Sequence, residues 1–130
     1  MKRWIAVAIG TLLIPAVLYA GSNAVMVVWG DVGPTMTATL TNTSRTLDNI
    51  VVTAGGTVKK NGLYPSGAYV TAETYAARFA MSTTPTVDNV GHLLAAAASV
   101  HIQGGSAVGS LKFVNAATDE VSVIHLTLEY

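Results

Sequence analysis

The sequence predicts an all-β fold, an antiparallel β-sandwich of jelly-roll or immunoglobulin-like type, preceded by an apolar N-terminal segment. The main observation is the alternation of apolar and polar residues in three runs of the last third. Because successive side chains on a strand point to opposite faces, such alternation indicates one buried face and one exposed face. Glycine-rich turns separate the runs, and the runs and turns follow one another at short, regular spacing. The apolar registers are Val100 and Ile102, then Leu111 and Phe113, then Ile124, Leu126, Leu128 and Tyr130.

The remaining strands are expected earlier in the body, which gives a total of eight or nine. Turn dipeptides separate them, and Asn61-Gly62 is a strong hairpin signal. Because strands flank the alanine-rich stretch His92–Ala98, we interpret that stretch as a loop, and Gly104-Gly105 and Gly109 as turn residues. The expected strands are Val25–Trp29, Met36–Thr41, Ile50–Thr53, Thr57–Lys60 with Leu63–Tyr64, Ala68–Thr71 and Tyr75–Met81.

The chain divides into an N-terminal segment, residues 1–24, and a β-sandwich domain, residues 25–130. Lys2 and Arg3 precede an uncharged apolar run, Trp4–Leu18, and small residues follow at 20–24. This order is typical of a bacterial secretory signal. A membrane anchor and a segment folded into the domain are the alternatives, since residues 4–20 are at the short limit for crossing a bilayer. Any membrane contact is expected through residues 4–20 only.

The composition is poor in charge. Charged residues make up 11% of the chain and the formal net charge is zero, against about 25% charged residues in ordinary domains. Either part of the chain lies in lipid or is removed, or much of its surface is buried against partner chains. The seven basic residues are scattered, so nucleic-acid binding is not expected. The absence of cysteine excludes disulfides, thiolate metal sites and cysteine nucleophiles.

No pattern of catalytic, cofactor-binding or metal-ligating residues accompanies the strands, so we predict no enzyme, no cofactor and no metal. The histidines are His92, His101 and His125, and their spacing does not match metal-ligand motifs. His101 and His125 fall on the polar faces of two expected strands, where we interpret them as surface residues that could be neighbours. No two carboxylates form an evident acid–base pair, and Gly104-Gly105-Ser106 lacks the G-x-S-x-G pattern.

Two tyrosines flank the expected turn at Pro65–Gly67. Tyr64 and Tyr69 could form a small exposed patch, although packing in the core or at an interface is the more common role of such residues.

The order of features in the C-terminal half resembles that of small β-sandwich proteins of tailed-phage virions, of the decoration, cement and head-fibre type. The resemblance covers Tyr75–Tyr130 and ends in two closing strands, Leu111–Asn115 and Val121–Tyr130. It implies a non-enzymatic jelly-roll or immunoglobulin-like domain, often trimeric, attached to a capsid or tail. The segments that carry it are Thr84-Pro85-Thr86-Val87, Gly91-His92-Leu93-Leu94 and Ser99-Val100-His101-Ile102.

The functional expectation is therefore a virion structural protein that decorates or cements a capsid or tail component. Its expected partners are further copies of itself, with a trimer as one option, and other virion proteins. The alternative is an exported bacterial adhesion or envelope module with a cleaved signal peptide, secreted or periplasmic. A membrane-anchored protein with the domain outside the membrane is a third hypothesis.

Overall fold

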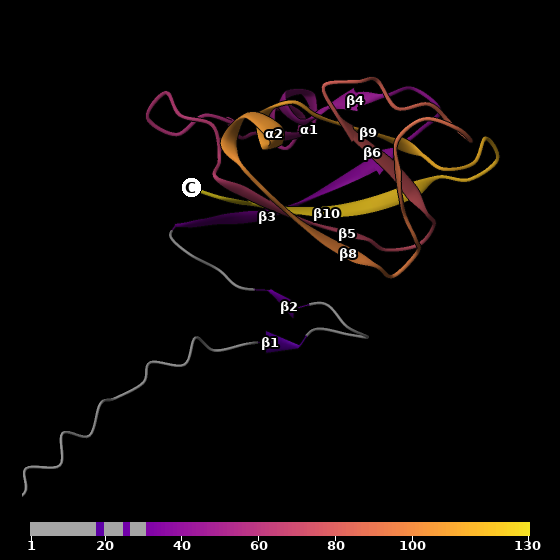
Figure 1. Cartoon of the computed structure of the whole chain (residues 1–130), viewed down its shortest axis with the longest axis horizontal. Helices are drawn as coiled ribbons and strands as arrows, with labels where there is room; N and C mark the ends of the chain where they lie inside the picture. Colours follow the sequence, from indigo (N-terminus) through magenta and orange to yellow (C-terminus); the bar gives the residue numbers. More distant parts are fainter. Residues whose placement is uncertain (1–17, 20–24, 27–30) are drawn as a thin grey trace, which may run out of the picture.

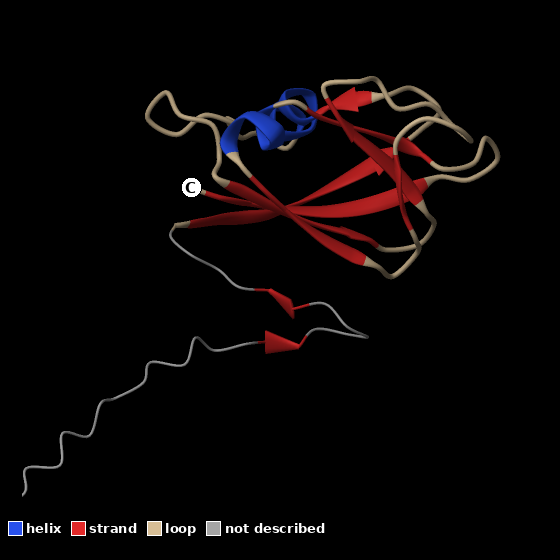
Figure 2. Ribbon diagram, in the orientation of Figure 1, coloured by secondary structure: helices blue, strands red, loops and turns tan. Residues whose placement is uncertain are grey.

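The protein is a sandwich of two four-stranded antiparallel sheets (Figures 1 and 2). This description rests on a computed structural model that describes residues 18–19, 25–26 and 31–130. The predicted all-β sandwich is confirmed. Two helices lie next to each other at one end of it (Figure 2).

The first sheet has the order β3 (Val32–Leu40), β10 (Ser122–Glu129), β5 (Gly67–Ala72) and β8 (Ser99–Gln103). The second has the order β4 (Arg45–Thr46), β9 (Leu111–Asn115), β6 (Ala77–Met81) and β7 (His92–Leu94). The helices are α1 (Leu47–Thr53) and α2 (Gly105–Gly109). A further two-residue pair, β1 (Leu18–Tyr19) with β2 (Val25–Met26), belongs to neither sandwich sheet.

The strand pairing is nested. β3 pairs with β10, β4 with β9, β5 with β8 and β6 with β7, all antiparallel. Four nested pairs are what a long antiparallel hairpin gives when it rolls up, and contacts of β10 with β5 and of β9 with β6 close the roll. This is the jelly-roll arrangement of eight strands. The strand order therefore decides between the two sandwich types that the sequence left open.

The core fills the space between the sheets, and each strand of the first sheet contributes alternate residues to it. On the central strand β10, Ile124, Leu126 and Leu128 are at most 1% exposed. Phe113 on β9 is the largest fully buried side chain of the opposite sheet. The other buried apolar residues include Ala38, Leu40, Ala68, Val70, Ala72, Ala77, Phe79, Leu94, Ile102 and Leu111.

The loop of residues 82–91 covers the outer face of the second sheet. Arg78 on β6 donates hydrogen bonds to the carbonyl oxygens of Asp88 (2.9 Å) and Gly91 (3.3 Å). Lys112 on β9 donates to Thr84 Oγ1 at 3.0 Å. Pro85 and Val114 are buried as a result. The Thr-Pro segment that the sequence placed in a loop is thus a cover for one face of the sandwich.

The prediction of a strand at Ile50–Thr53 was wrong, because these residues belong to α1. The side chain of Thr46 caps the helix by accepting a hydrogen bond from the backbone N–H of Asn49 at 3.1 Å. Leu47, Ile50 and Val51 are its buried residues, and their spacing of three and four is that of a helix face. Capping and this spacing outweigh the β propensity of the valines.

Two further predictions need correction. His92–Leu94 is the strand β7, so the loop before β8 begins only at Ala95. The glycine-rich segment at 105–109 is the short helix α2 and not a simple turn.

The turn at Asn61-Gly62 is confirmed, but its hairpin is minimal. Lys60 and Leu63 exchange two backbone hydrogen bonds of 3.0 Å as an isolated bridge. Asn61 and Gly62 both have positive φ values, 53° and 79°, as a two-residue hairpin turn of type I′ requires.

The predicted strand at Val25–Trp29 is described only at β2, and the rest of it lies outside the described residues. Of the N-terminal segment, residues 1–24, only Leu18 and Tyr19 are among the described residues. Within the described part of the chain, no helix has the length and apolar character needed to cross a membrane.

We expect Leu126→Ala to destabilise the fold by about 2–5 kcal/mol, because it leaves a cavity at a fully buried position of the central strand. Leu93→Ala is the matched control: Leu93 is 58% exposed, so its loss costs about 0.5 kcal/mol or less. Urea unfolding followed by circular dichroism measures both. Equal losses would contradict the assignment of β10 to the core.

Candidate functional site

The outer face of the first sheet is a polar surface, which we call the polar face. It consists of the side chains that alternate with the core residues on the four strands, and most of its polar groups bond to one another. Its members are Thr35, Thr37 and Thr39 on β3, Val123, His125, Thr127 and Glu129 on β10, Gly67, Tyr69 and Thr71 on β5, and Ser99, His101 and Gln103 on β8.

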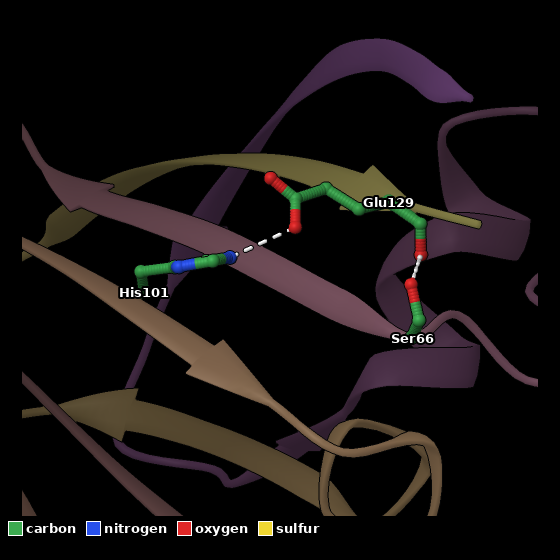
Figure 3. A network of polar contacts seen from close by, with 3 residues as sticks. All are labelled: Ser66, His101 and Glu129. Atoms are coloured by element: carbon green, nitrogen blue, oxygen red, sulfur yellow. Dashed lines mark hydrogen bonds and ion pairs between the residues drawn. The ribbon is translucent and has the colours of Figure 1, made fainter. Parts of the chain in front are cut away.

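The most buried polar contact of this face joins His101 to Glu129 (Figure 3). The two atoms, His101 Nε2 and Glu129 Oε2, are 2.8 Å apart, and the side chains are 18% and 5% exposed. Because a carboxylate only accepts hydrogen bonds, Nε2 carries the proton of this bond. The other oxygen, Glu129 Oε1, is buried and has no hydrogen-bond partner among the described residues.

A glycine makes this contact possible. Gly67 on β5 lies between Glu129 on β10 and Gln103 on β8 in the register of the sheet. A Cβ atom at Gly67 would overlap Glu129 Oε2 and approach His101 Nε2 to 3.2 Å. The missing side chain therefore leaves the gap through which Glu129 reaches across β5 to β8.

Ser66 holds the backbone at the C-terminal end of β10. Its hydroxyl donates to the backbone carbonyl of Glu129 at 3.2 Å (Figure 3). Its N–H donates to the same carbonyl at 2.7 Å. The backbone at Glu129 is thus held from the β5 side while its side chain extends over Gly67.

The second histidine joins three elements. His125 Nε2 donates to Glu73 Oε2 at 3.0 Å, so the Nδ1 atom of the neutral ring accepts the hydroxyl hydrogen of Thr37, also at 3.0 Å. His125 and Glu73 are more accessible than His101 and Glu129, with side chains 36% and 56% exposed.

Two hydroxyl pairs complete the face. Thr35 and Thr127 are 2.8 Å apart, as are Thr71 and Ser99. Since each pair joins residues directly opposite on adjacent strands, it supports the register of the sheet.

The prediction that His101 and His125 share the polar side of the C-terminal strands is confirmed. They lie on the same face, two strands apart and one row apart, and each has its own carboxylate. His101 lies on the outer face as a surface residue was expected to, but its side chain is only 18% exposed beside Glu129, and its ring centroid is 6.5 Å from that of Tyr69. His92 lies elsewhere, on β7 beside Phe79.

The chain Thr37–His125–Glu73 has the hydroxyl, imidazole, carboxylate order of a hydrolytic triad. Such a triad also needs a cavity that holds the substrate beside the nucleophile. Thr37 borders a hollow of about 300 Å³ next to α1, but neither His125 nor Glu73 lines it. No group of three or more potential metal ligands occurs in the described part of the chain. Among the described residues, these bonds order the surface of the sheet, and the hollow beside Thr37 does not extend to His125 or Glu73.

A cleft of about 370 Å³ lies at the sandwich end next to Lys60 and Tyr130. Lys60 donates a hydrogen bond to Asp31, with 2.5 Å between the two atoms. This bond and the positive charge of Lys60 hold the pKa of Asp31 below its ordinary value. The remaining lining residues are Asn61, Leu63, Tyr64 and Ser66.

Tyr64 and Tyr69 contact different parts of the molecule. The ring of Tyr64 packs on Gly109 in α2, where a Cβ would approach it to 2.9 Å, and Lys59 lies 4.5 Å from its centroid. Tyr69 instead faces His101 on the polar face. Tyr64 is 40% exposed and Tyr69 is half-buried, and because they contact different elements they do not form one patch.

Sequence reasoning did not single out Asn115. Its buried amide nitrogen donates to Asn42 Oδ1 (2.8 Å) and to the carbonyl oxygens of Ala117 (3.2 Å) and Glu120 (2.5 Å). It organises the connection from β9 to β10, and only its position in an otherwise apolar register, Leu111–Phe113–Asn115, was a signal in the sequence.

Comparisons of the chain with family models, with curated proteins and with solved structures find no match.

We expect Gly67→Ala to cost about 1–3 kcal/mol of unfolding free energy, because the new methyl group displaces the Glu129 carboxylate from its gap. The measurement is urea unfolding of a double-mutant cycle with Glu129→Ala. In the Glu129→Ala background the same glycine substitution has a much smaller cost. An equal cost in both backgrounds would show that the gap does not serve Glu129.

We expect Lys60→Met to raise the pKa of Asp31 toward its ordinary value, measured by NMR titration of the carboxyl carbon. Because the folded pKa is the lower one, Asp31 stabilises the fold above its unfolded pKa, and this stabilisation is lost as pH falls through the folded pKa. Lys59→Met is the control, since Lys59 lies over Tyr64. A pKa that Lys60→Met leaves unchanged would contradict the contact.

Proposed function

We propose that this chain is a non-enzymatic structural protein of a phage virion, which decorates or cements a capsid or tail component. The observation that carries the proposal is the internal pairing of the polar face. Its carboxylate, Glu129, is bonded to His101, and Glu73 at the end of β5 is bonded to His125. The hydroxyls of the face are bonded as well, namely those of Thr35, Thr37, Thr71, Thr127 and Ser99.

Such a face suits a protein that functions with this surface buried against neighbouring proteins. Burying a polar group costs free energy unless the group keeps a hydrogen bond. Here the bonds already exist within the sheet, so a neighbouring protein can cover the face without leaving these groups unpaired. The low charge of the chain supports the same role, since charged residues are depleted at the centres of interfaces.

The fold and the expected assembly agree with each other. The jelly-roll order fits the resemblance of residues 75–130 to phage decoration, cement and head-fibre proteins, and viral capsid domains are among the known users of this architecture. In this proposal the partners are further copies of the chain and other virion proteins, and the location is the virion.

An exported bacterial adhesion or envelope module is the second candidate. The observation in its favour is the signal-like order of Lys2, Arg3 and the apolar run up to Leu18. In that case the same sandwich would act outside the cytoplasm, without residues 1–24.

The intact mass of the chain in density-purified phage particles tests the two against each other. We expect the chain to stay with the particles through a high-salt wash, with a mass that includes Met1 or lacks only Met1. Its absence from the particles would overturn the virion proposal. A mass that begins near Gly21 or Val25 would establish export instead.

A further inference from the structure

Along one side of β3, backbone hydrogen-bonding groups lack a partner within residues 31–130. The N–H of Glu73 on the β5 side bonds to the carbonyl of Val123 at 2.8 Å, so the odd-numbered residues of β10 point their backbone groups toward β5. The backbone groups of residues 122, 124 and 126 therefore point toward β3. They bond to their register partners Leu40, Ala38 and Met36. Because backbone direction alternates along a strand, the residues between them on β3 point outward.

The outward residues are Thr35, Thr37 and Thr39. The carbonyl of Thr39 accepts a hydrogen bond from Arg45 at 3.1 Å, which confirms this direction and closes that end of the edge. Within residues 31–130, the outward backbone groups of Thr35 and Thr37 have no hydrogen-bond partner. Both residues are exposed.

The other edges of the sandwich are protected in ways that β3 is not. β4 has two residues, β7 three and β8 five, whereas β3 has nine. Natural proteins keep edge strands short or place charges and prolines on them to prevent pairing with another chain. β3 carries no charged residue, and its one proline, Pro34, precedes the open stretch at Thr35–Thr37.

We propose that β3 is the interface between two copies of this chain, paired antiparallel about a two-fold axis at Met36. This inference rests on the proposed function only for the statement that the chain forms an oligomer. It adds the surface through which two copies pair. In this register Thr35 of each copy faces Thr37 of its partner, and both backbone bonds are exchanged. The bond from Arg45 to Thr39 stays intact, and the first sheets of the two copies join into one continuous sheet.

The surroundings of the edge fit a second strand. The side chains of Thr35 and Thr37 are held on the polar face by Thr127 and His125, and opposed threonines across the joint stabilise a sheet. On the core side, the hollow of about 300 Å³ between β3 and α1 leaves space along the edge. The pairing is self-complementary, which an isologous dimer requires.

Sedimentation equilibrium of the full chain and of two proline variants tests the edge. Thr37→Pro removes an outward N–H and leaves the backbone bonds of β3 to β10 in place, although it also removes the hydroxyl that bonds to His125. We expect it to weaken dimerisation at least ~100-fold, since each bond lost contributes about tenfold. Gln103→Pro is the matched control on the outward side of β8, and it leaves the dimer intact.

A disulfide measurement covers the case in which Thr37→Pro does not fold. The chain contains no cysteine, so Met36→Cys places a single thiol at the axis, opposite its counterpart. Non-hydrogen-bonded antiparallel pairs have Cα atoms about 4.5 Å apart, which is within disulfide range. We expect Met36→Cys to form the covalent dimer under mild oxidation. Thr39→Cys is the control. Position 39 does not lie opposite position 39 of the partner in this register, so this variant stays monomeric on a non-reducing gel.

Several outcomes would overturn the inference. They are a monomeric or trimeric wild-type chain, equal loss of association in Thr37→Pro and Gln103→Pro, and equal cross-linking of the two cysteine variants. A monomeric chain that still remains with purified particles would remove this interface and leave the virion proposal standing. A dimeric chain that is absent from purified particles would overturn the virion proposal and leave the β3 interface standing.

Discussion

The position of β10 is the constraint on which the rest of this structure depends. The last strand in the sequence is an inner strand of its sheet, with β3 from the start of the domain on one side and β5 on the other. Until the final residues are in place, β3 has no strand partner in its sheet and β5 has only β8. Contacts across so much of the sequence are slow to form, because loop-closure entropy is lost before they stabilise the chain. The cooperativity of the sandwich therefore rests on its C-terminal residues.

The polar face follows from the same strand. Since Ile124, Leu126 and Leu128 point into the core, the intervening residues must point outward, and they include His125 and Glu129. A carboxylate in the buried position of Glu129 needs a partner, and the register supplies His101 through the gap at Gly67. The sheet thus brings together on one surface polar groups that are far apart in the sequence, and it satisfies most of them internally.

Alternation was sufficient to predict the strands at Leu111–Asn115 and Val121–Tyr130, because in each of them every second residue is a buried apolar or polar residue of the core face. It failed at Ile50–Val52, where β-branched residues resemble a strand but the cap at Thr46 starts a helix. It also failed at β7, whose three residues stand before an alanine run and bury only Leu94.

The pair of His101 and Glu129 depends on which strands become neighbours, and no local pattern encodes that choice. The sequence could place both histidines on polar faces, but not the carboxylate that each one binds. Nor could it assign a role to Gly67, which it predicted only as part of a turn.

The loop that Arg78 holds over the second sheet gives the molecule two unlike sides. One side is closed by the protein's own chain, with Pro85 and Val114 beneath it. On the other side, the side chains of the first sheet form a broad surface of their own. A sandwich of this kind has a defined front and back, so copies arranged in a layer can all present the same side outward. In the proposed assembly, the orientation of each copy would then follow from the asymmetry of the single chain.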